Sequence, residues 1–187
     1  MPPPAARRPD PVGDLEADLV ALAAADSDLE RDAEAGERLR IERAAVTLAD
    51  RLRATRGRVE LTSRGGGRHA GRVVEVGADW VLLAAPTSQH VVRLACLTAV
   101  RGLGRAASAP ASTLPPRSLG SLLRTWCRDR AEVGVSLADG EVLAGLASAA
   151  YADHLELSTG GGATVAVPWE ALAVVSRCPG CRGGSAP

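Results

Sequence analysis

Residues 71–83, GRVVEVGADWVLL, decide the fold, because residues 145–157, GLASAAYADHLEL, repeat their pattern later in the chain. Both stretches open with a glycine, place an aspartate eight residues after it (Asp79 and Asp153), and end in alternating apolar residues. Alternation of apolar residues with a period of two is typical of a β-strand with one buried face. The shared spacing indicates that one structural unit occurs twice.

The match extends in both directions from these stretches. The same offset of 74 residues relates Leu48 to Leu122 and residues 59–61 to residues 133–135. With one extra residue in the later copy, the match continues through Val92 with Val167, Leu97 with Leu172, and Val100 with Val175. The sequence therefore predicts an internal duplication that covers residues 48–175.

Each copy is predicted to contain a short helix and five short strands. The helices are residues 48–56 and 122–128. The strands are 58–62, 71–76, 80–83, 90–94 and 99–101 in the first copy, and 132–137, 145–149, 154–157, 164–167 and 173–176 in the second. Such short strands, separated by glycine-rich turns, favour a small closed barrel over a sandwich, because closure leaves no unpaired edge. The predicted fold class is α+β: an N-terminal helical segment followed by two tandem five-stranded barrels.

Composition divides the chain into six parts. We predict a disordered proline-rich tail (1–13), an acidic helical segment (14–44), the first barrel repeat (45–104), a linker (105–118), the second barrel repeat (119–177) and a tail (178–187). The acidic segment has apolar residues at helical spacing. It is compatible with two helices or with one helix kinked near Gly36.

The two copies resemble the Sm-like family of small SH3-type barrels. Residues 124–140, RTWCRDRAEVGVSLADG, are similar to the helix and first hairpin of that fold, and residues 100–102, VRG, resemble the Ile-Arg-Gly of its second motif. Residues 71–83 also resemble the C-terminal barrel of the bacterial ribosome maturation factor. The resemblance implies small barrels of a kind that binds RNA.

The chain departs from that family at the base-binding pocket. Sm proteins hold a base with an Asp and an Asn near the third strand. This sequence has Gly77 and Tyr151 at the first of these positions and Val81 and Leu155 at the second. The overall layout also resembles a group of actinobacterial proteins labelled Fis-type transcriptional regulators, although the sequence contains no recognisable helix-turn-helix.

Charge is balanced overall but uneven along the chain. The 22 basic residues, all of them arginine, match 22 acidic residues. Residues 1–44 carry 6 arginines and 11 acids (net −5), whereas residues 45–105 carry 10 arginines and 4 acids (net +6). A basic block attracts phosphates, or it is neutralised by an acidic block beside it. The sequence leaves both alternatives open.

The candidate nucleic-acid-binding residues belong to this basic block. Three arginines surround a glycine-rich hairpin turn, where guanidinium groups can clamp phosphates; the alternative is a solvated turn. Neighbouring arginines, including Arg58, would extend them into a continuous basic face. Aromatic residues that could stack on bases are sparse and lie at apolar positions, which weakens the case for sequence-specific RNA recognition. The five predicted site residues are Arg64, Arg68, Arg72, Arg93 and Arg101.

The residues support neither a membrane protein nor an enzyme. No stretch reaches the roughly 20 apolar residues of a membrane span, and the N-terminus lacks a signal-like apolar core, so we expect a cytoplasmic protein. No phosphate-binding loop or catalytic triad is recognisable, and Cys178-Pro-Gly-Cys181 offers only half a zinc site. We therefore predict no catalysis, no cofactor and no metal. The expected partner is RNA or DNA, and the alternative is a protein-interaction scaffold or homo-oligomer.

Overall fold

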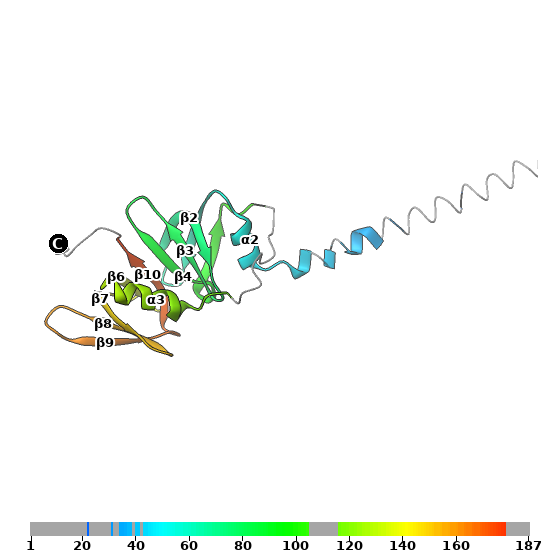
Figure 1. Cartoon of the computed structure of the whole chain (residues 1–187). Coiled ribbons are helices and arrows are strands. Elements are labelled where there is room, and N and C mark those ends of the chain that lie inside the picture. Colours follow the sequence, from blue (N-terminus) through cyan, green and yellow to red (C-terminus); the bar gives the residue numbers. More distant parts are fainter. Residues whose placement is uncertain are drawn as a thin grey trace, which may run out of the picture. The chain divides into compact units, whose positions relative to one another are not determined.

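The computed structural model of the chain describes residues 22, 31, 34–38, 40, 41, 43–104 and 116–178 (Figure 1). The predicted tail 1–13, most of the acidic segment, and much of the linker and of the C-terminal tail lie outside the described residues. The chain divides into two compact units, residues 1–46 and 47–187. The described residues of the first unit are helical up to Ala45. No helix in the described part of the chain has the length and apolar character needed to span a membrane.

The described residues of the second unit form two helices, a short 3-10 helix and ten strands. The first half consists of α2 (Leu48–Ala54), β1 (Arg58–Ser63), β2 (Arg68–Val76), β3 (Trp80–Ala84), β4 (Gln89–Arg93), η1 (Leu94–Cys96) and β5 (Leu97–Arg101). The second half consists of α3 (Leu119–Arg128), β6 (Glu132–Leu137), β7 (Val142–Ala150), β8 (His154–Ser158), β9 (Thr164–Pro168) and β10 (Leu172–Arg177).

All ten strands belong to one antiparallel sheet, in the order β5-β1-β2-β3-β4-β10-β6-β7-β8-β9. The second five strands repeat the order of the first five. The two halves join where β4 pairs with β10, with Val92 opposite Val174 and Val91 opposite Val175. The protein is therefore an α+β fold in which two similar halves share one sheet.

The prediction of closed barrels is wrong, because the sheet is open. Among the described residues, β5 pairs only with β1, and β9 pairs only with β8. The outer edge of β4 pairs with β10 of the other half. A strand edge has one row of N–H and C=O groups, so pairing between the halves takes the bonds that closure within one half would need.

Gly71 and Gly145 occupy equivalent places in β2 and β7, where a neighbouring strand comes close. A Cβ atom at Gly71 would lie 2.6 Å from the carbonyl oxygen of Ala84, and one at Gly145 would lie 2.6 Å from that of Ser158. Both distances are far shorter than a van der Waals contact. Each half therefore needs glycine at this place for the same steric reason.

Side-chain caps define where both helices begin. The Thr47 hydroxyl accepts a hydrogen bond from the Asp50 N–H (3.2 Å), and the Asp50 carboxylate accepts one from the Thr47 N–H (3.0 Å), which makes a capping box for α2. Hydrogen bonds from Thr47 hold the pKa of Asp50 below its ordinary value. The Ser118 hydroxyl accepts from the Ser121 N–H at the start of α3.

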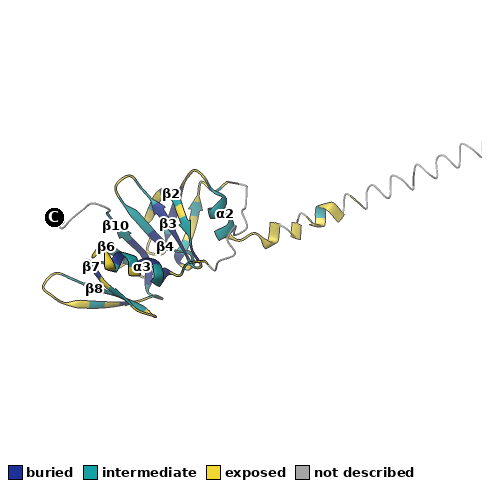
Figure 2. Ribbon diagram, viewed as in Figure 1, coloured by how far each residue is buried: buried dark blue, intermediate teal, exposed yellow. Residues whose placement is uncertain are grey.

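The hydrophobic core crosses the junction between the halves. On β4, Val91 belongs to one apolar cluster and Val92 to the other, because successive side chains of a strand point to opposite faces. Trp80 and Leu82 of β3 join Val91 in the cluster that contains the buried face of α3. Figure 2 shows buried residues along β3, β4 and β10. These strands are covered on both faces, so the two halves form one packed body.

Candidate nucleic-acid interface

The outer face of β5, β1 and β2 gathers most of the arginines singled out in the sequence. Val59 and Leu61 of β1 point into the core, so Arg58, Glu60 and Thr62 point outward. The antiparallel register places Arg72 opposite Arg58, Arg101 opposite Glu60, and Arg68 opposite Thr62. We call Arg58, Arg68, Arg72 and Arg101, together with Glu60, the basic face.

The basic face carries four positive charges and one negative charge, and its four arginines are exposed. Glu60 forms an ion pair with Arg101 (3.1 Å) and a longer one with Arg68 (3.8 Å), and these two arginines remain 61% and 68% exposed. The side chains of Arg58 and Arg72 make no hydrogen bond or ion pair with the described residues. Arg68 and Arg72 are four residues apart on one strand, which corresponds to about 13 Å. A phosphate backbone can therefore contact several of these guanidinium groups at once.

The other two predicted residues lie elsewhere. Arg64 is exposed in the turn between β1 and β2, beside the basic face, and its N–H donates to the Cys96 carbonyl (2.8 Å). Arg93 is only 17% exposed, and it donates hydrogen bonds to the Asp79 carboxylate (3.3 Å) and to the Trp169 carbonyl. Because its guanidinium group links the two halves, Arg93 is not part of the basic face.

Arg58 belongs to the basic face but not to the five predicted residues. The signal that could have identified it is the alternation of β1, in which apolar Val59 and Leu61 require their neighbours to face outward. What the sequence could not supply is the pairing of β1 with β5, which brings Arg101 to this face across 41 positions of the chain.

The equivalent face of the second half has lost these charges. The paired positions there hold Glu132 opposite Leu146, Ser136 opposite Val142, and Gly134 opposite Ser176. Four of these residues, Glu132, Gly134, Leu146 and Ser176, line a groove of about 850 Å³ together with Cys178. Within the described residues, the arginine cluster is therefore a property of the first half alone.

Two histidines lie on the inner side of the sheet behind the basic face. The rings of His69 and His90 are 5.1 Å apart, and burial lowers the pKa of both. His90 bridges the Ser88 hydroxyl (2.9 Å) and the Ser176 hydroxyl (2.8 Å) across the junction of β4 and β10. These contacts give the histidines a structural role at the junction.

The described residues contain no cluster of three histidine, cysteine, aspartate or glutamate side chains that could hold a metal ion. Cys96 is buried, and Cys127 is half-buried on α3. The Sγ of Cys178 lies 2.9 Å from the Thr87 carbonyl oxygen, and Cys181 lies outside the described residues.

Comparisons of the chain with protein-family models, with curated proteins and with solved structures gave no match.

Proposed function

We propose that this protein is a non-enzymatic, cytoplasmic regulator that binds RNA or DNA through the phosphates, using the basic face. The observation that carries the proposal is the register of β5, β1 and β2, which places four exposed arginines on one surface with a single acid. Backbone phosphates are the common feature of nucleic acids, and arginine recognises them with paired hydrogen bonds. Each half of the sheet is proposed to be an Sm-like, SH3-like unit, in agreement with the repeated strand order.

The geometry favours binding with little sequence specificity. The basic face presents guanidinium groups but no aromatic ring, and its neighbours on the strands are small or polar, such as Thr62 and Ala70. Trp80 and Trp126 are fully buried, so neither can stack on a base. Contacts of this kind position a nucleic acid without reading its sequence.

The test is fluorescence anisotropy of labelled single-stranded RNA and duplex DNA against the full chain at several salt concentrations. The Arg58→Ala/Arg72→Ala variant removes the two arginines of the basic face whose side chains make no ion pair with the described residues. It should weaken binding and lower the slope of log K against log salt by about 1.4 for a single strand. The matched control, Arg38→Ala/Arg40→Ala, removes the same charge from helical residues paired with Glu34 and Glu37. It should change neither the affinity nor the salt slope. No binding by the full chain at low salt would reject the proposal.

A protein-interaction scaffold is the second candidate, and the open edges of the sheet favour it. Among the described residues, β5 and β9 each have one strand neighbour. Pro168 in β9 has no N–H to donate, so β5 is the edge that offers a free row of backbone groups to an extended peptide. Failure of the chain to bind nucleic acid in the anisotropy experiment would leave this candidate in place.

A further inference from the structure

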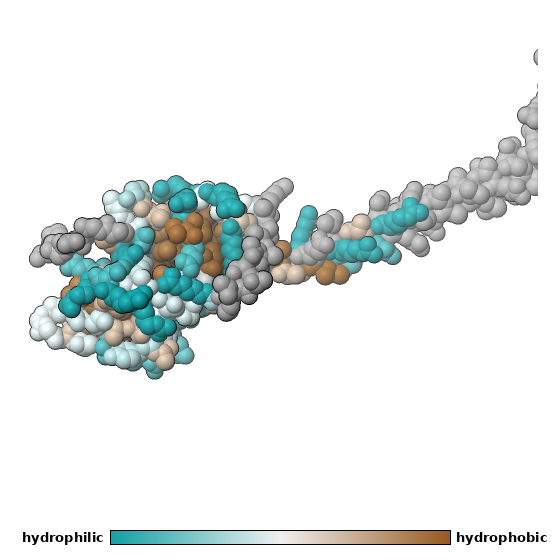
Figure 3. Space-filling model, in the orientation of Figure 1, coloured by the Kyte–Doolittle hydropathy of each residue, from teal (hydrophilic) through white to brown (hydrophobic). Residues whose placement is uncertain are grey.

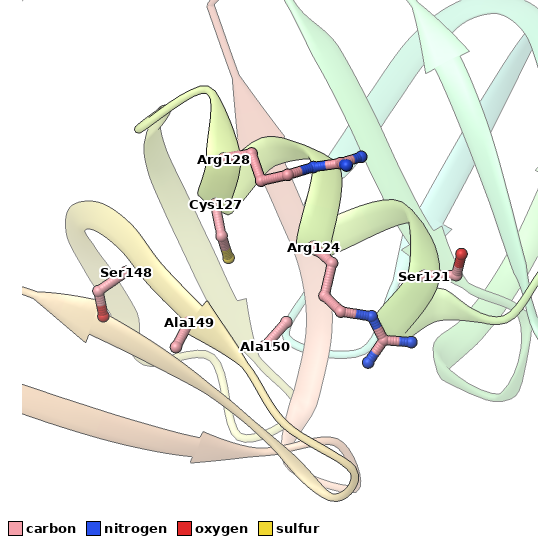
Figure 4. A pocket seen from close by; sticks show the side chains of 7 residues that line it. All are labelled: Ser121, Arg124, Cys127, Arg128, Ser148, Ala149 and Ala150. Carbon is pink, nitrogen blue, oxygen red and sulfur yellow. The ribbon is translucent and has the colours of Figure 1, made fainter.

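A groove between α3 and β7 carries two arginines and no carboxylate among its lining residues. It has a volume of about 470 Å³ and is lined by Ser121, Arg124, Cys127, Arg128, Ser148, Ala149 and Ala150 (Figure 4). The side chain of Arg124 makes no hydrogen bond or ion pair with the described residues. The side chain of Arg128 makes one hydrogen bond with the described residues, a long one to the Thr125 hydroxyl (3.4 Å). Strongly hydrophilic residues gather over α3 in Figure 3.

In the first half, the residues equivalent to some of the groove residues are charged and form ion pairs. The 74-residue offset relates Arg124 to Asp50, Cys127 to Arg53, and Ala149 to Glu75. In the first half, Arg53 pairs with Asp50 (2.9 Å), and Glu75 lies 3.9 Å from Arg117.

The second half has exchanged both acids, one for arginine and one for alanine. It therefore lacks the equivalents of the two carboxylates that pair with Arg53 and Arg117, and a hollow lies beside Ala149. The guanidinium groups of Arg124 and Arg128 are exposed beside this hollow, and an anion from solution would supply the partner that the carboxylates supply in the first half.

Other groups at the groove do not neutralise the two arginines. Asp129, which follows Arg128 in the chain, is already paired with Arg177 (3.4 Å). Burial raises the pKa of the Cys127 thiol, so at neutral pH this side chain brings no negative charge. The Ser148 hydroxyl donates its proton to the Glu156 carbonyl (3.0 Å), so it has no further proton to donate to an anion. The Ser121 hydroxyl is available as a donor.

We propose that the groove between α3 and β7 binds a phosphate ester through Arg124 and Arg128. Guanidinium groups match phosphate oxygens with paired, charge-assisted hydrogen bonds. Ala149 and Ala150 give an apolar floor for the carbon part of the ester, and the volume lies in the range of small-ligand sites. The proposal does not rest on the basic face, with which this groove shares no residue.

The test is titration of the full-length, 15N-labelled chain with inorganic phosphate, with a nucleoside monophosphate and with a short single-stranded oligonucleotide, followed by amide NMR. Saturable shifts at residues 121–128 and 148–150 are expected. Shifts with the monophosphate identify a free ester as the source, and shifts with the oligonucleotide alone identify a nucleic-acid backbone. Absence of shifts at these residues with all three probes would overturn the proposal.

Three variants separate this site from the basic face. Arg124→Ala/Arg128→Ala should weaken the interaction at least about ten-fold, because each lost hydrogen bond involves two charged groups. Ala149→Glu, which restores the acid found in the first half, should abolish it while the amide spectrum elsewhere stays unchanged. Arg58→Ala/Arg72→Ala should leave the shifts at residues 121–128 intact. Binding that survives both groove variants would refute the site, whatever the fate of the basic face.

Discussion

Glu60 gives the sharpest test of how the basic face works, because its removal should improve binding. Glu60 is the one acid of that face, and it holds Arg101 at 3.1 Å and Arg68 at 3.8 Å. Glu60→Gln keeps the shape of the side chain but raises the net charge of the face from +3 to +4. An exposed ion pair contributes about 0.2–1 kcal/mol, so releasing both arginines should tighten binding by roughly 2- to 30-fold.

The assay is anisotropy of a labelled single strand at salt concentrations between about 0.05 and 0.2 M, where phosphate contacts have their strongest effect. The steeper salt dependence of Glu60→Gln should approach the slope of about 2.8 that four phosphate contacts produce on a single strand. Glu132→Gln, at the outer face of the second half, removes one acid in the same way and should change the affinity little. Equal or weaker binding by Glu60→Gln would refute the idea that these arginines contact phosphate.

Three further predictions concern the fold. Burial lowers the pKa values of His69 and His90 from the ordinary 6.5, so the unfolded chain binds more protons than the folded chain as the pH falls. Their contribution to stability is therefore complete above pH 6.5 and is lost below it. The urea midpoint should fall between about pH 7.5 and 5.5, and it should fall less in His69→Gln/His90→Gln. Gly145→Ala should destabilise the chain by about 1–3 kcal/mol because its Cβ would strike the backbone, whereas Gly134→Ala, which meets nothing within 4 Å, should be tolerated; equal urea midpoints would contradict this. Analytical ultracentrifugation should give a mass that does not grow with protein concentration. The reason is that the surface of β8 and β9 is polar, whereas the equivalent surface of β3 and β4 is apolar and packs against the other half. A mass that rises with concentration would show that the sheet edges assemble.

The strands could be predicted from the sequence, but the way they join could not. Alternation of apolar residues and glycine-rich turns mark each strand locally, and the predicted strands overlap the observed ones. The free edge of β4 could pair with a strand of its own half, which would close a barrel, or with β10 of the other half, as observed. Both choices satisfy the same backbone groups, so local sequence patterns cannot distinguish them.

The same distinction applies to the candidate site, where some placements follow from a single strand and others depend on how the strands join. The outward direction of Arg68 and Arg72 follows from the period of one strand, which the sequence shows directly. Arg93 also lies in a strand, but it belongs to the strand at the junction, where its neighbours come from the other half. The role of an arginine therefore depends on whether its strand is at an edge or at a junction, and this is a property of the whole sheet.

The two halves join through an apolar surface, and the equivalent surface at the other end of the sheet is not apolar. This difference explains why a further copy of the unit does not extend the sheet. The outer surface of β3 and β4 carries Trp80, Leu82 and Val91, which are buried together with α3 of the next half. The matching positions on β8 and β9 hold His154, Glu156 and Ala166, so another copy docking there would have to bury an imidazole and a carboxylate.

Pro168, at the end of the free strand β9, also has no N–H to offer a new neighbour. The two halves therefore share a strand order but differ in two ways. One half keeps a charged outer face, and the other ends the sheet with polar residues and proline, which is how natural edge strands avoid further pairing.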